Sequence, residues 1–296
     1  MNFAFGCDEN NVLGLAVTIK SLLNTTTHPC TFFILNMGIT ASDKALLTTS
    51  FPDHKVHLLD LSLKELSGMR PTMYLRTQAV YSRLLLDQKL PVHLDRALWL
   101  DTDVIVNSDI SQVYHADLKG NVIGAVEDVS VNHLTAEHIQ HLQKDLGIEN
   151  PQDYFNSGVL LIDLQKWRAQ AIGQKAVAFA RQHYHAMHAQ DQDVLNAVLK
   201  GNWEHLPGKW NQSQYLPNLN ENEGIIHLIG KCKPWHADYE YRFKERFFEI
   251  LDSTAFKGRR PYHLWGLARY LKMLERKLPT PEIVWGKLGR LTRTRE

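Results

Sequence analysis

The chain has 296 residues, of which 44% are hydrophobic and 22% are charged. These proportions are ordinary for a folded globular protein and exclude a disordered or fibrous chain. Its apolar runs end well short of the roughly 18 residues that a membrane-spanning helix needs, and its N-terminus lacks the basic segment of a secretory signal. Its three cysteines show no CxxC spacing, which argues against a disulfide scaffold or a structural zinc site and favours the reducing cytoplasm.

A formal net charge of +1 conceals an uneven distribution of charge along the chain. Residues 257–296 contain 11 Lys and Arg against three Glu, a net charge of +8, so residues 1–256 carry a net charge of −7. This contrast predicts an acidic folded body, residues 1–256, and a basic tail, residues 257–296, that meets an anionic surface.

Short β-rich runs alternate with helical patterns through the first 130 residues. The predicted strands are 2–7, 31–35, 55–59, 97–100 and 122–126. The predicted helices are 13–23, 42–48 and 77–87. Strands separated by helices form βαβ units, so the sequence predicts an α/β fold with a mostly parallel central sheet flanked by helices. In such a sheet, ligands bind beyond the carboxyl ends of the strands.

The second half of the chain has a less regular pattern. A predicted strand over 158–164 leads into one long helix over 165–184, and a short helix follows over 192–199. Residues 207–224 are rich in Asn, Gln and Pro and have no apolar period, which predicts a long surface loop.

Two carboxylates follow the most apolar of the predicted strands. Asp101 and Asp103 are two residues apart, so both can converge on one divalent cation, which would keep coordination sites for phosphate oxygens. The pair could instead cap a helix in a surface turn. It also fits the nucleophile loop of haloacid-dehalogenase-like phosphatases, in which Asp101 would be phosphorylated and Asp103 would act as acid and base. That family places the loop on its first strand, whereas about a hundred residues precede it here, so this alternative is weaker.

Three later segments carry dense polar motifs. Residues 154–168, YFNSGVLLIDLQKWR, place a polar turn before a buried strand, and residues 190–196, QDQDVLN, open a helix. Residues 227–236, HLIGKCKPWH, join an imidazole, a glycine turn and lysines, which suits a loop that folds over a diphosphate. Asp191 and Asp193 could also simply complement the helix dipole, and a lone histidine is more often structural than a metal ligand.

Taken in order, from Phe3 to about Trp235, these segments resemble glycosyltransferase family 8, whose members are retaining enzymes with a GT-A fold that use UDP-sugars. Within the family, the similarity is to the bacterial lipooligosaccharide and lipopolysaccharide galactosyl- and glucosyltransferases. The resemblance implies that residues 1–256 form a GT-A catalytic domain, with a Rossmann-like, mostly parallel central sheet flanked by helices.

The resemblance also implies roles for individual residues. The metal, usually Mn²⁺ with Mg²⁺ as a possible substitute, would be bound by Asp101, Asp103 and His227. The donor would be contacted by the backbone of Phe5 and by Asp8, Asn10, Arg83, Thr102, Asp128, Asn156, Gly230 and Lys233. Asp191 and Gln192 would be the catalytic pair beside the donor sugar. The sequence departs from the galactosyltransferase subgroup at Asn11, where that subgroup has an aromatic residue.

Retention of anomeric configuration needs either a covalent intermediate or attack from the leaving-group face. Gln192 is an amide and therefore a poor nucleophile, which favours front-face attack with a UDP phosphate oxygen taking the proton of the acceptor hydroxyl. Double displacement is the alternative.

Five leucines at spacings of three and four residues form an apolar stripe in the basic tail, with Lys and Arg among them. They are Leu264, Leu267, Leu271, Leu274 and Leu278. Such a segment predicts attachment to an anionic membrane surface, although the stripe could instead pack on the protein's own domain or on a dimer partner. The acidic body makes nucleic acid a poor partner.

These expectations combine into one predicted function. A cytoplasmic enzyme, attached peripherally to the inner face of the cytoplasmic membrane, would transfer galactose or glucose from a UDP-hexose to a glycolipid or oligosaccharide acceptor of the lipopolysaccharide or lipooligosaccharide type. The alternatives are the phosphatase and a non-catalytic relative that binds a nucleotide sugar. The presence of all three expected metal ligands argues against a loss of activity.

Overall fold

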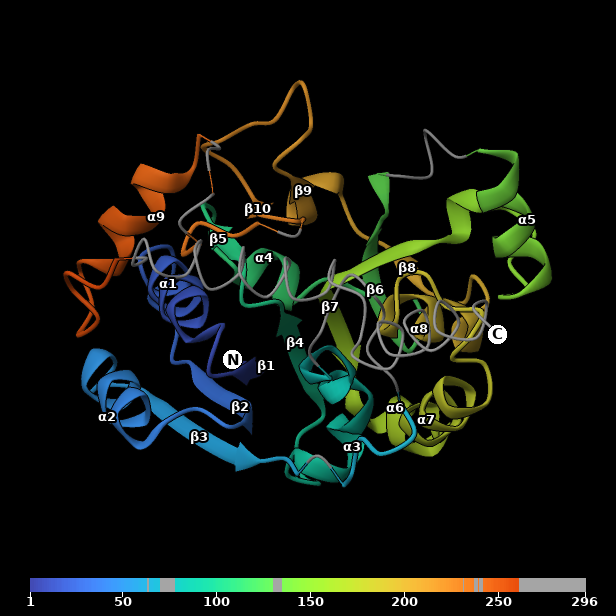
Figure 1. Ribbon diagram of the computed structural model, residues 1–296, viewed down its shortest axis with the longest axis horizontal. Helices are drawn as coiled ribbons and strands as arrows, with labels where there is room; N and C mark the ends of the chain where they lie inside the picture. The colour runs from blue at the N-terminus through green and yellow to red at the C-terminus, as the bar shows by residue number, and fades with distance from the viewer. Residues whose placement is uncertain are drawn as a thin grey trace, which may run out of the picture.

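A seven-stranded sheet forms the centre of the computed structural model, which describes residues 1–62, 64–69, 78–129, 135–230, 232–236, 239 and 242–260 (Figure 1). The strand order is β3-β2-β1-β4-β7-β6-β8. These strands are β1 (Asn2–Asp8), β2 (Thr31–Met37), β3 (Lys55–Asp60), β4 (Arg96–Leu100), β6 (Ile123–Glu127), β7 (Phe155–Asp163) and β8 (Glu204–His205). A smaller sheet, in the order β5-β10-β9, contains β5 (Val104–Val106), β9 (Gln212–Ser213) and β10 (Ile225–His227).

Parallel pairing dominates the large sheet. β1 is parallel to β2 and β4, β2 to β3, and β6 to β8, whereas β7 runs antiparallel to β4 and β6. The predicted α/β fold with a mostly parallel central sheet is confirmed. Because β1 and β4 are parallel neighbours, the loops that follow them lie at the same end of the sheet.

Helices cover both faces of the sheet (Figure 1). One core, between the sheet and its first helical layer, includes side chains of α1 (Val12–Leu23), α2 (Ala41–Ser50), α4 (Ser111–Tyr114) and α9 (Lys244–Leu251). The opposite core includes side chains of the 3₁₀ helix η1 (Ala79–Leu85) and of α3 (Leu86–Lys89), α6 (Leu164–Ala169), α7 (Ile172–Gln182) and α8 (Asp191–Leu199). The described residues also contain α5 (Ala136–Lys144) and the 3₁₀ helices η3 (Pro151–Asp153) and η4 (Gly208–Asn211).

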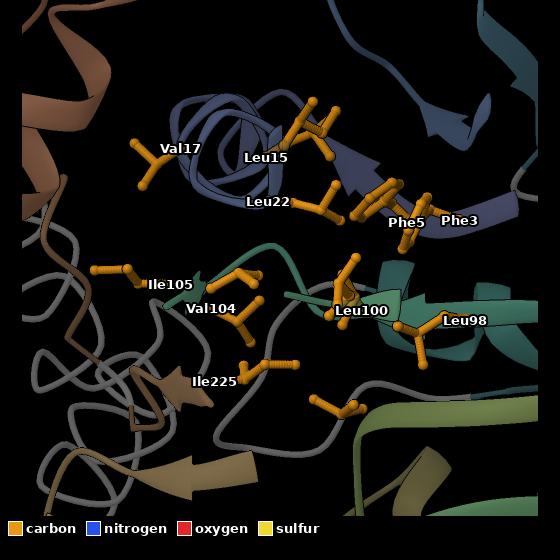
Figure 2. Packing of buried hydrophobic residues seen from close by; sticks show 14 of the residues in the cluster. Phe3, Phe5, Leu15, Val17, Leu22, Leu98, Leu100, Val104, Ile105 and Ile225 are labelled. Atoms are coloured by element: carbon orange, nitrogen blue, oxygen red, sulfur yellow. The ribbon is translucent and has the colours of Figure 1, made fainter. Parts of the chain in front are cut away.

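Alternation along β4 divides its side chains between the two cores. Leu98 and Leu100 pack on the side of α1, whereas Ala97 and Trp99 pack on the side of η1 and α6. Figure 2 shows the first of these cores, where side chains from α1, β1, β4 and β5 meet. β4 is buried on both faces, as is usual for a central strand. The polar residues Asp101 and Asp103 follow directly after it and therefore lie at the end of the sheet.

Two of the predicted helices differ in the structure. The single helix predicted over 165–184 is wrong: α6 ends at Ala169 and α7 begins at Ile172, because Ala171 adopts a left-handed conformation with φ of 52° that interrupts the helix. The helix predicted over 77–87 is the 3₁₀ helix η1 followed by the single turn of α3, and residue 77 lies outside the described residues.

The surface loop predicted over 207–224 is wrong in its first half. This stretch contains η4 and β9, and residues 210–214 are buried. Polar composition did not mean exposure here, because the buried amides have partners: Nε2 of Gln212 donates to the carbonyls of Glu223 at 2.7 Å and Asn220 at 3.2 Å. The segment therefore delivers polar side chains to the interior.

The beginning of the predicted basic tail contacts the body. Arg259 pairs with Asp43 at 2.7 Å and Arg260 pairs with Asp252 at 2.5 Å, while Phe256 just before them is fully buried. The leucine stripe lies in residues 261–296, outside the described residues. Within the described part of the chain, no helix has the length and apolar character to cross a membrane. All three cysteines are free thiols.

Candidate functional site

Two acidic residues and one histidine converge where β4 ends. Asp101 and Asp103 lie between β4 and β5, and the antiparallel pairing of β5 with β10 places His227 opposite Val104. One ligand atom from each of the three side chains lies within 4.8 Å of the others. Nε2 of His227 is 3.3 Å from Asp103 and 3.8 Å from Asp101. The predicted metal ligands are thus brought together from segments more than a hundred residues apart.

This donor set fits a divalent cation. Two carboxylates and one imidazole suit Mn²⁺ or a similar first-row metal better than Ca²⁺ or Mg²⁺, which prefer oxygen alone. Asp103 and His227 are buried, whereas Asp101 is partly exposed and Thr102 lies at the cavity wall between the two acids. A cation held there would remain accessible to a ligand from the cavity.

Two basic side chains flank the acidic pair. Lys233 donates to a carboxylate oxygen of Asp103 and, at 3.0 Å, to the carbonyl of Leu228. Burial opposes ionisation of Asp103, but the charges of Lys233 and His227 outweigh it and hold the pKa of this carboxyl well below its usual range. Asp103 is therefore a carboxylate at neutral pH.

Arg83 is the second basic side chain, and it is only 3% exposed. Its guanidinium pairs with Asp101 at 2.6 Å through Nη2 and with Asp191 at 3.0 Å through Nε, and it also donates to the carbonyl of Ser157. The guanidinium lies 4.8 Å over the ring of Trp99, whose indole N–H donates to Asp101 at 3.1 Å. Arg83 therefore joins the loop after β4 to the N-terminus of α8.

A cavity of about 330 Å³ collects these groups. Its wall includes seven residues singled out from the sequence: Arg83, Asp101, Thr102, Asp103, His227, Gly230 and Lys233. Gly6, Asn11, Trp99 and Ile229 also contribute to the wall. A cavity with a carboxylate pair, an imidazole and two cations is suited to an anionic ligand that arrives with a divalent metal.

The glycine at position 230 is required by its conformation. Gly230 has φ of 110°, and a Cβ there would lie 2.7 Å from the hydroxyl of Tyr215. The turn brings the chain back so that Lys233 can reach Asp103. Its predicted closure on a pyrophosphate stays a prediction.

The end of β1 and the loop after it place the residues predicted to bind the donor beside the cavity. Asp8 accepts hydrogen bonds from the backbone N–H of Asn10 at 3.0 Å and from Nδ2 of Asn11 at 2.8 Å. Phe5 has a fully buried side chain, so only its backbone could face a ligand. Asn11, which the sequence marked only as a departure from the galactosyltransferase subgroup, lines the cavity itself.

A second cluster of polar side chains lies around the start of α8. Asn156 and Gln192 both donate to the same Asp128 oxygen at 2.9 Å, and Oε1 of Gln192 accepts from the backbone N–H of Ser157 at 3.1 Å. These bonds fix the orientation of the Gln192 amide. The structure thus brings together Asp128, Asn156 and Gln192, three of the residues predicted to surround the donor sugar.

Asp191 is buried beside this group. Its carboxylate accepts from the Ser157 hydroxyl at 3.0 Å and pairs with Arg83. Burial raises the pKa of Asp191 from 3.8 to about 6 although Arg83 acts in the opposite direction, and nearby Asp101 adds to the rise. Gln190, the buried residue before it, has φ of 49° and ψ of −115°, a strained conformation for a residue with a side chain.

Asp193, two residues further along α8, forms hydrogen bonds to the loop before the helix and to Tyr154. One carboxylate oxygen accepts from the backbone N–H groups of His188 and Ala189, both at 2.7 Å, and the other accepts from the Tyr154 hydroxyl at 2.6 Å. Asp193 therefore holds the loop before α8, whereas Asp191 faces Arg83.

Sequence reasoning missed several residues of the site. Trp99 and Ser157 lie in segments that it singled out, but only the three-dimensional arrangement shows their contacts to Arg83, Asp101 and Asp191. Asn211 was missed altogether, because it falls in the stretch predicted as a surface loop.

Comparison with known proteins identifies similar chains. Residues 2–239 match the family model described as Glycosyl transferase family 8. The chain is 29% identical over 279 residues to the lipopolysaccharide 1,2-glucosyltransferase of Escherichia coli strain K12, covering 88% of this chain and 80% of that protein. It is 27% identical over 276 residues to the lipopolysaccharide 1,3-galactosyltransferase of Salmonella typhimurium strain LT2, covering 86% and 79%.

Similarity extends to solved structures. A crystal structure of the galactosyltransferase LgtC in complex with donor and acceptor sugar analogs matches with a TM-score of 0.76 and 28% identity. The match covers 86% of this chain and 96% of that one.

Proposed function

The chain belongs to glycosyl transferase family 8 and is a glycosyltransferase with a GT-A fold; from this premise we propose its donor, acceptor and metal. The donor is UDP-glucose or UDP-galactose, the metal is Mn²⁺, and the acceptor is a glycan of the lipopolysaccharide or lipooligosaccharide type. Relatives named as lipopolysaccharide glucosyl- and galactosyltransferases support this choice of sugars and acceptor. Transfer proceeds with retention of anomeric configuration.

The observation that carries this proposal is the meeting of Asp101, Asp103 and His227 beside Lys233 and Arg83 in one cavity. A bound divalent cation supplies Lewis-acid stabilisation to the diphosphate as the glycosidic bond breaks. Lys233 and Arg83 add positive charge on either side of the acids, so this chain's own groups also favour the departing UDP. Asp8, at the end of β1, and Asn10, in the loop that follows, are proposed to bind the uridine part of the donor.

Gln192 is proposed to position the donor sugar. Its carbonyl oxygen and one amide N–H are engaged by Ser157 and Asp128, which leaves an amide of fixed orientation and low nucleophilicity. This supports attack by the acceptor hydroxyl from the leaving-group face, with a phosphate oxygen of UDP taking its proton. Asp191 is paired with Arg83, and we assign it a role in holding Arg83 rather than as a nucleophile.

We also propose that residues 257–296 attach the enzyme to an anionic membrane surface on the cytoplasmic side. The net charge of +8 and the leucine stripe of this segment support the proposal. The catalytic domain would then be residues 1–256, with Arg259 and Arg260 forming the contact between the two parts.

The test is release of UDP from UDP-glucose and UDP-galactose, measured with Mn²⁺, with Mg²⁺ and with EDTA, each with and without a lipooligosaccharide acceptor. We expect one UDP-hexose to be turned over, the acceptor to increase the rate, and EDTA to abolish it. Asp103→Asn should remove the metal-dependent rate. Full activity in EDTA would refute the metal assignment, and the donor assignment would be refuted if UDP were released from neither UDP-glucose nor UDP-galactose.

A further inference from the structure

Asn211, the last residue of η4, forms hydrogen bonds to two side chains of the site, those of His227 and Asn156. Its Oδ1 lies 2.9 Å from Nδ1 of His227, and its Nδ2 lies 2.8 Å from Oδ1 of Asn156. Asn211 and His227 are each only 5% exposed, so bulk water does not replace these bonds. η4 is anchored by Trp210, which is buried in the core on the α1 side of the sheet.

The direction of each hydrogen bond in this bridge follows from one backbone group. The N–H of Gly158 can only donate, and it lies 3.0 Å from Oδ1 of Asn156, which identifies that atom as the oxygen. Asn211 must therefore present its NH₂ group to Asn156 and its oxygen to His227. An oxygen facing Nδ1 requires a proton on Nδ1, so the neutral imidazole carries its lone pair on Nε2.

That tautomer is the one a metal-binding histidine needs here, because Nε2 is the atom that faces Asp101 and Asp103. We propose that Asn211 is a positioning residue that fixes the tautomer and the ring orientation of His227 for a divalent cation. The inference rests on the metal site of the proposed function and adds to that site a residue that orients one of its ligands. Losing the partner of a ligating histidine typically weakens metal binding about 10–100-fold.

The bridge also reaches the region proposed for the donor sugar. Nδ2 of Asn156 donates to Asp128, and Gln192 donates to the same oxygen. His227 and Gln192 are therefore joined by a continuous series of side-chain hydrogen bonds that runs through Asn211, Asn156 and Asp128. Removing only the link between Asn211 and Asn156 should disturb Gln192 while leaving the acceptor for His227 in place.

The experiment uses two variants of the full chain. Asn211→Leu keeps the approximate volume but loses both bonds, whereas Asn211→Asp keeps an oxygen for Nδ1–H and loses the donor to Asn156. Binding of Mn²⁺ is measured by electron paramagnetic resonance of the free ion, with and without UDP, and kcat is measured by UDP release. We expect Asn211→Leu to raise the Kd for Mn²⁺ about 10–100-fold. Asn211→Asp should bind Mn²⁺ within about threefold of wild type while its kcat falls about tenfold or more, in the range of other supporting residues.

Gln212→Leu is the matched control. Gln212 is the next residue, is similarly buried, and bonds Asn220 and Glu223 rather than the site. It should lower the thermal midpoint without changing the Kd for Mn²⁺. The proposal is overturned if Asn211→Leu binds Mn²⁺ as wild type does, if Gln212→Leu weakens binding equally, or if Asn211→Asp loses as much affinity as Asn211→Leu. If His227→Ala also binds Mn²⁺ normally, the proposed metal site itself is wrong.

A second measurement determines the tautomer in the wild-type protein itself. Long-range ¹H–¹⁵N spectra of the wild-type imidazoles, with His227 assigned by its loss in His227→Ala, report which ring nitrogen carries a proton. We expect Nδ1 of His227 to carry a proton, because it lies 2.9 Å from the Asn211 oxygen and can reach it only as a donor. A neutral ring protonated only on Nε2 would contradict the inference.

Discussion

Gly158 lies directly against the imidazole of His227: a Cβ at position 158 would come within 2.2 Å of Cε1 and 2.7 Å of Nδ1. Only a glycine allows this approach. Strand β7 therefore provides the surface on which the ring rests, while the backbone N–H of the same glycine orients Asn156. One residue thus determines both how close the ring can lie and which way its partner amides point.

Gly158→Ala should consequently damage the metal site. The added methyl group must displace the imidazole, which moves Nε2 away from Asp103, and overpacking of this kind typically costs about 1–3 kcal/mol of stability. We expect a Kd for Mn²⁺ raised at least about tenfold, comparable to loss of a supporting residue. Titration with Mn²⁺ and urea denaturation measure the two effects.

Gly208→Ala is the control for that substitution, because a Cβ at position 208 would meet no atom within 4 Å. It should leave both the affinity for Mn²⁺ and the free energy of unfolding close to wild type. Equal effects of the two substitutions would show that the close contact with His227 is not what Gly158 provides.

The three proposed metal ligands were predictable because each lies in a recognisable sequence motif. Asp101 and Asp103 follow an apolar strand that can be identified by composition, and His227 begins a segment with a glycine and lysines in the order that family 8 shows. Asn211 has no such signal. Its two partners lie 16 and 55 residues away, and it lies in a polar stretch without an apolar period, so its burial is seen only in the three-dimensional structure.

The fold class was also predictable from local patterns, whereas one helix boundary was not, because it depends on tertiary structure. The alternation of strands and helices indicated the α/β class, since the periods are set by burial on each face of the sheet. The break at Ala171 was missed because a left-handed alanine leaves no trace in the composition. In both failures a local backbone or side-chain arrangement, set by tertiary contacts, overrode the pattern.

The raised pKa of Asp191 predicts a specific dependence of stability on pH. Burial, opposed by Arg83, gives this carboxyl a pKa of about 6 in the folded protein. Between its unfolded and folded pKa values the folded chain binds more protons, so this group lowers stability as the pH rises from about 4 to 6. Asp191→Asn removes the effect.

We therefore expect the free energy of unfolding of Asp191→Asn, relative to wild type, to rise by up to about 3 kcal/mol between pH 4 and pH 7, at roughly 1.4 kcal/mol per pKa unit. Urea denaturation of both proteins across this range measures the difference. A relative stability that is constant with pH would contradict a raised pKa at this position.

Gln192→Ala should reduce kcat strongly and leave the KM for the donor nearly unchanged. A group that only positions the sugar contributes mainly in the transition state, so its removal lowers kcat and kcat/KM together. Initial rates of UDP release across donor concentrations test this. Gln165→Ala removes an amide that bonds Asp95 at 2.6 Å on an exposed surface, and it should leave both constants unchanged. A large rise in KM with unchanged kcat would assign Gln192 to ground-state binding instead.

Deleting residues 261–296 should separate membrane binding from catalysis. The cut retains Arg259 and Arg260 with their partners on the body, and every proposed metal and UDP contact lies before residue 236, so hydrolysis of the donor should persist. The deleted segment carries eight Lys and Arg. Each is worth about 1 kcal/mol near an anionic surface, and salt should weaken that contribution.

The leucine stripe predicts a second effect of the same deletion, the loss of vesicle binding that resists salt. Apolar burial at the membrane interface is insensitive to salt, so some full-length protein should stay bound to anionic vesicles at salt concentrations that screen the charges. Replacing Leu267 and Leu274 by Ser should remove this salt-resistant fraction and spare the binding seen at low salt. Vesicle sedimentation of the three proteins across a salt series measures both. If the full-length and truncated chains sediment equally, the stripe packs on the catalytic domain or on a second copy, and the membrane proposal fails.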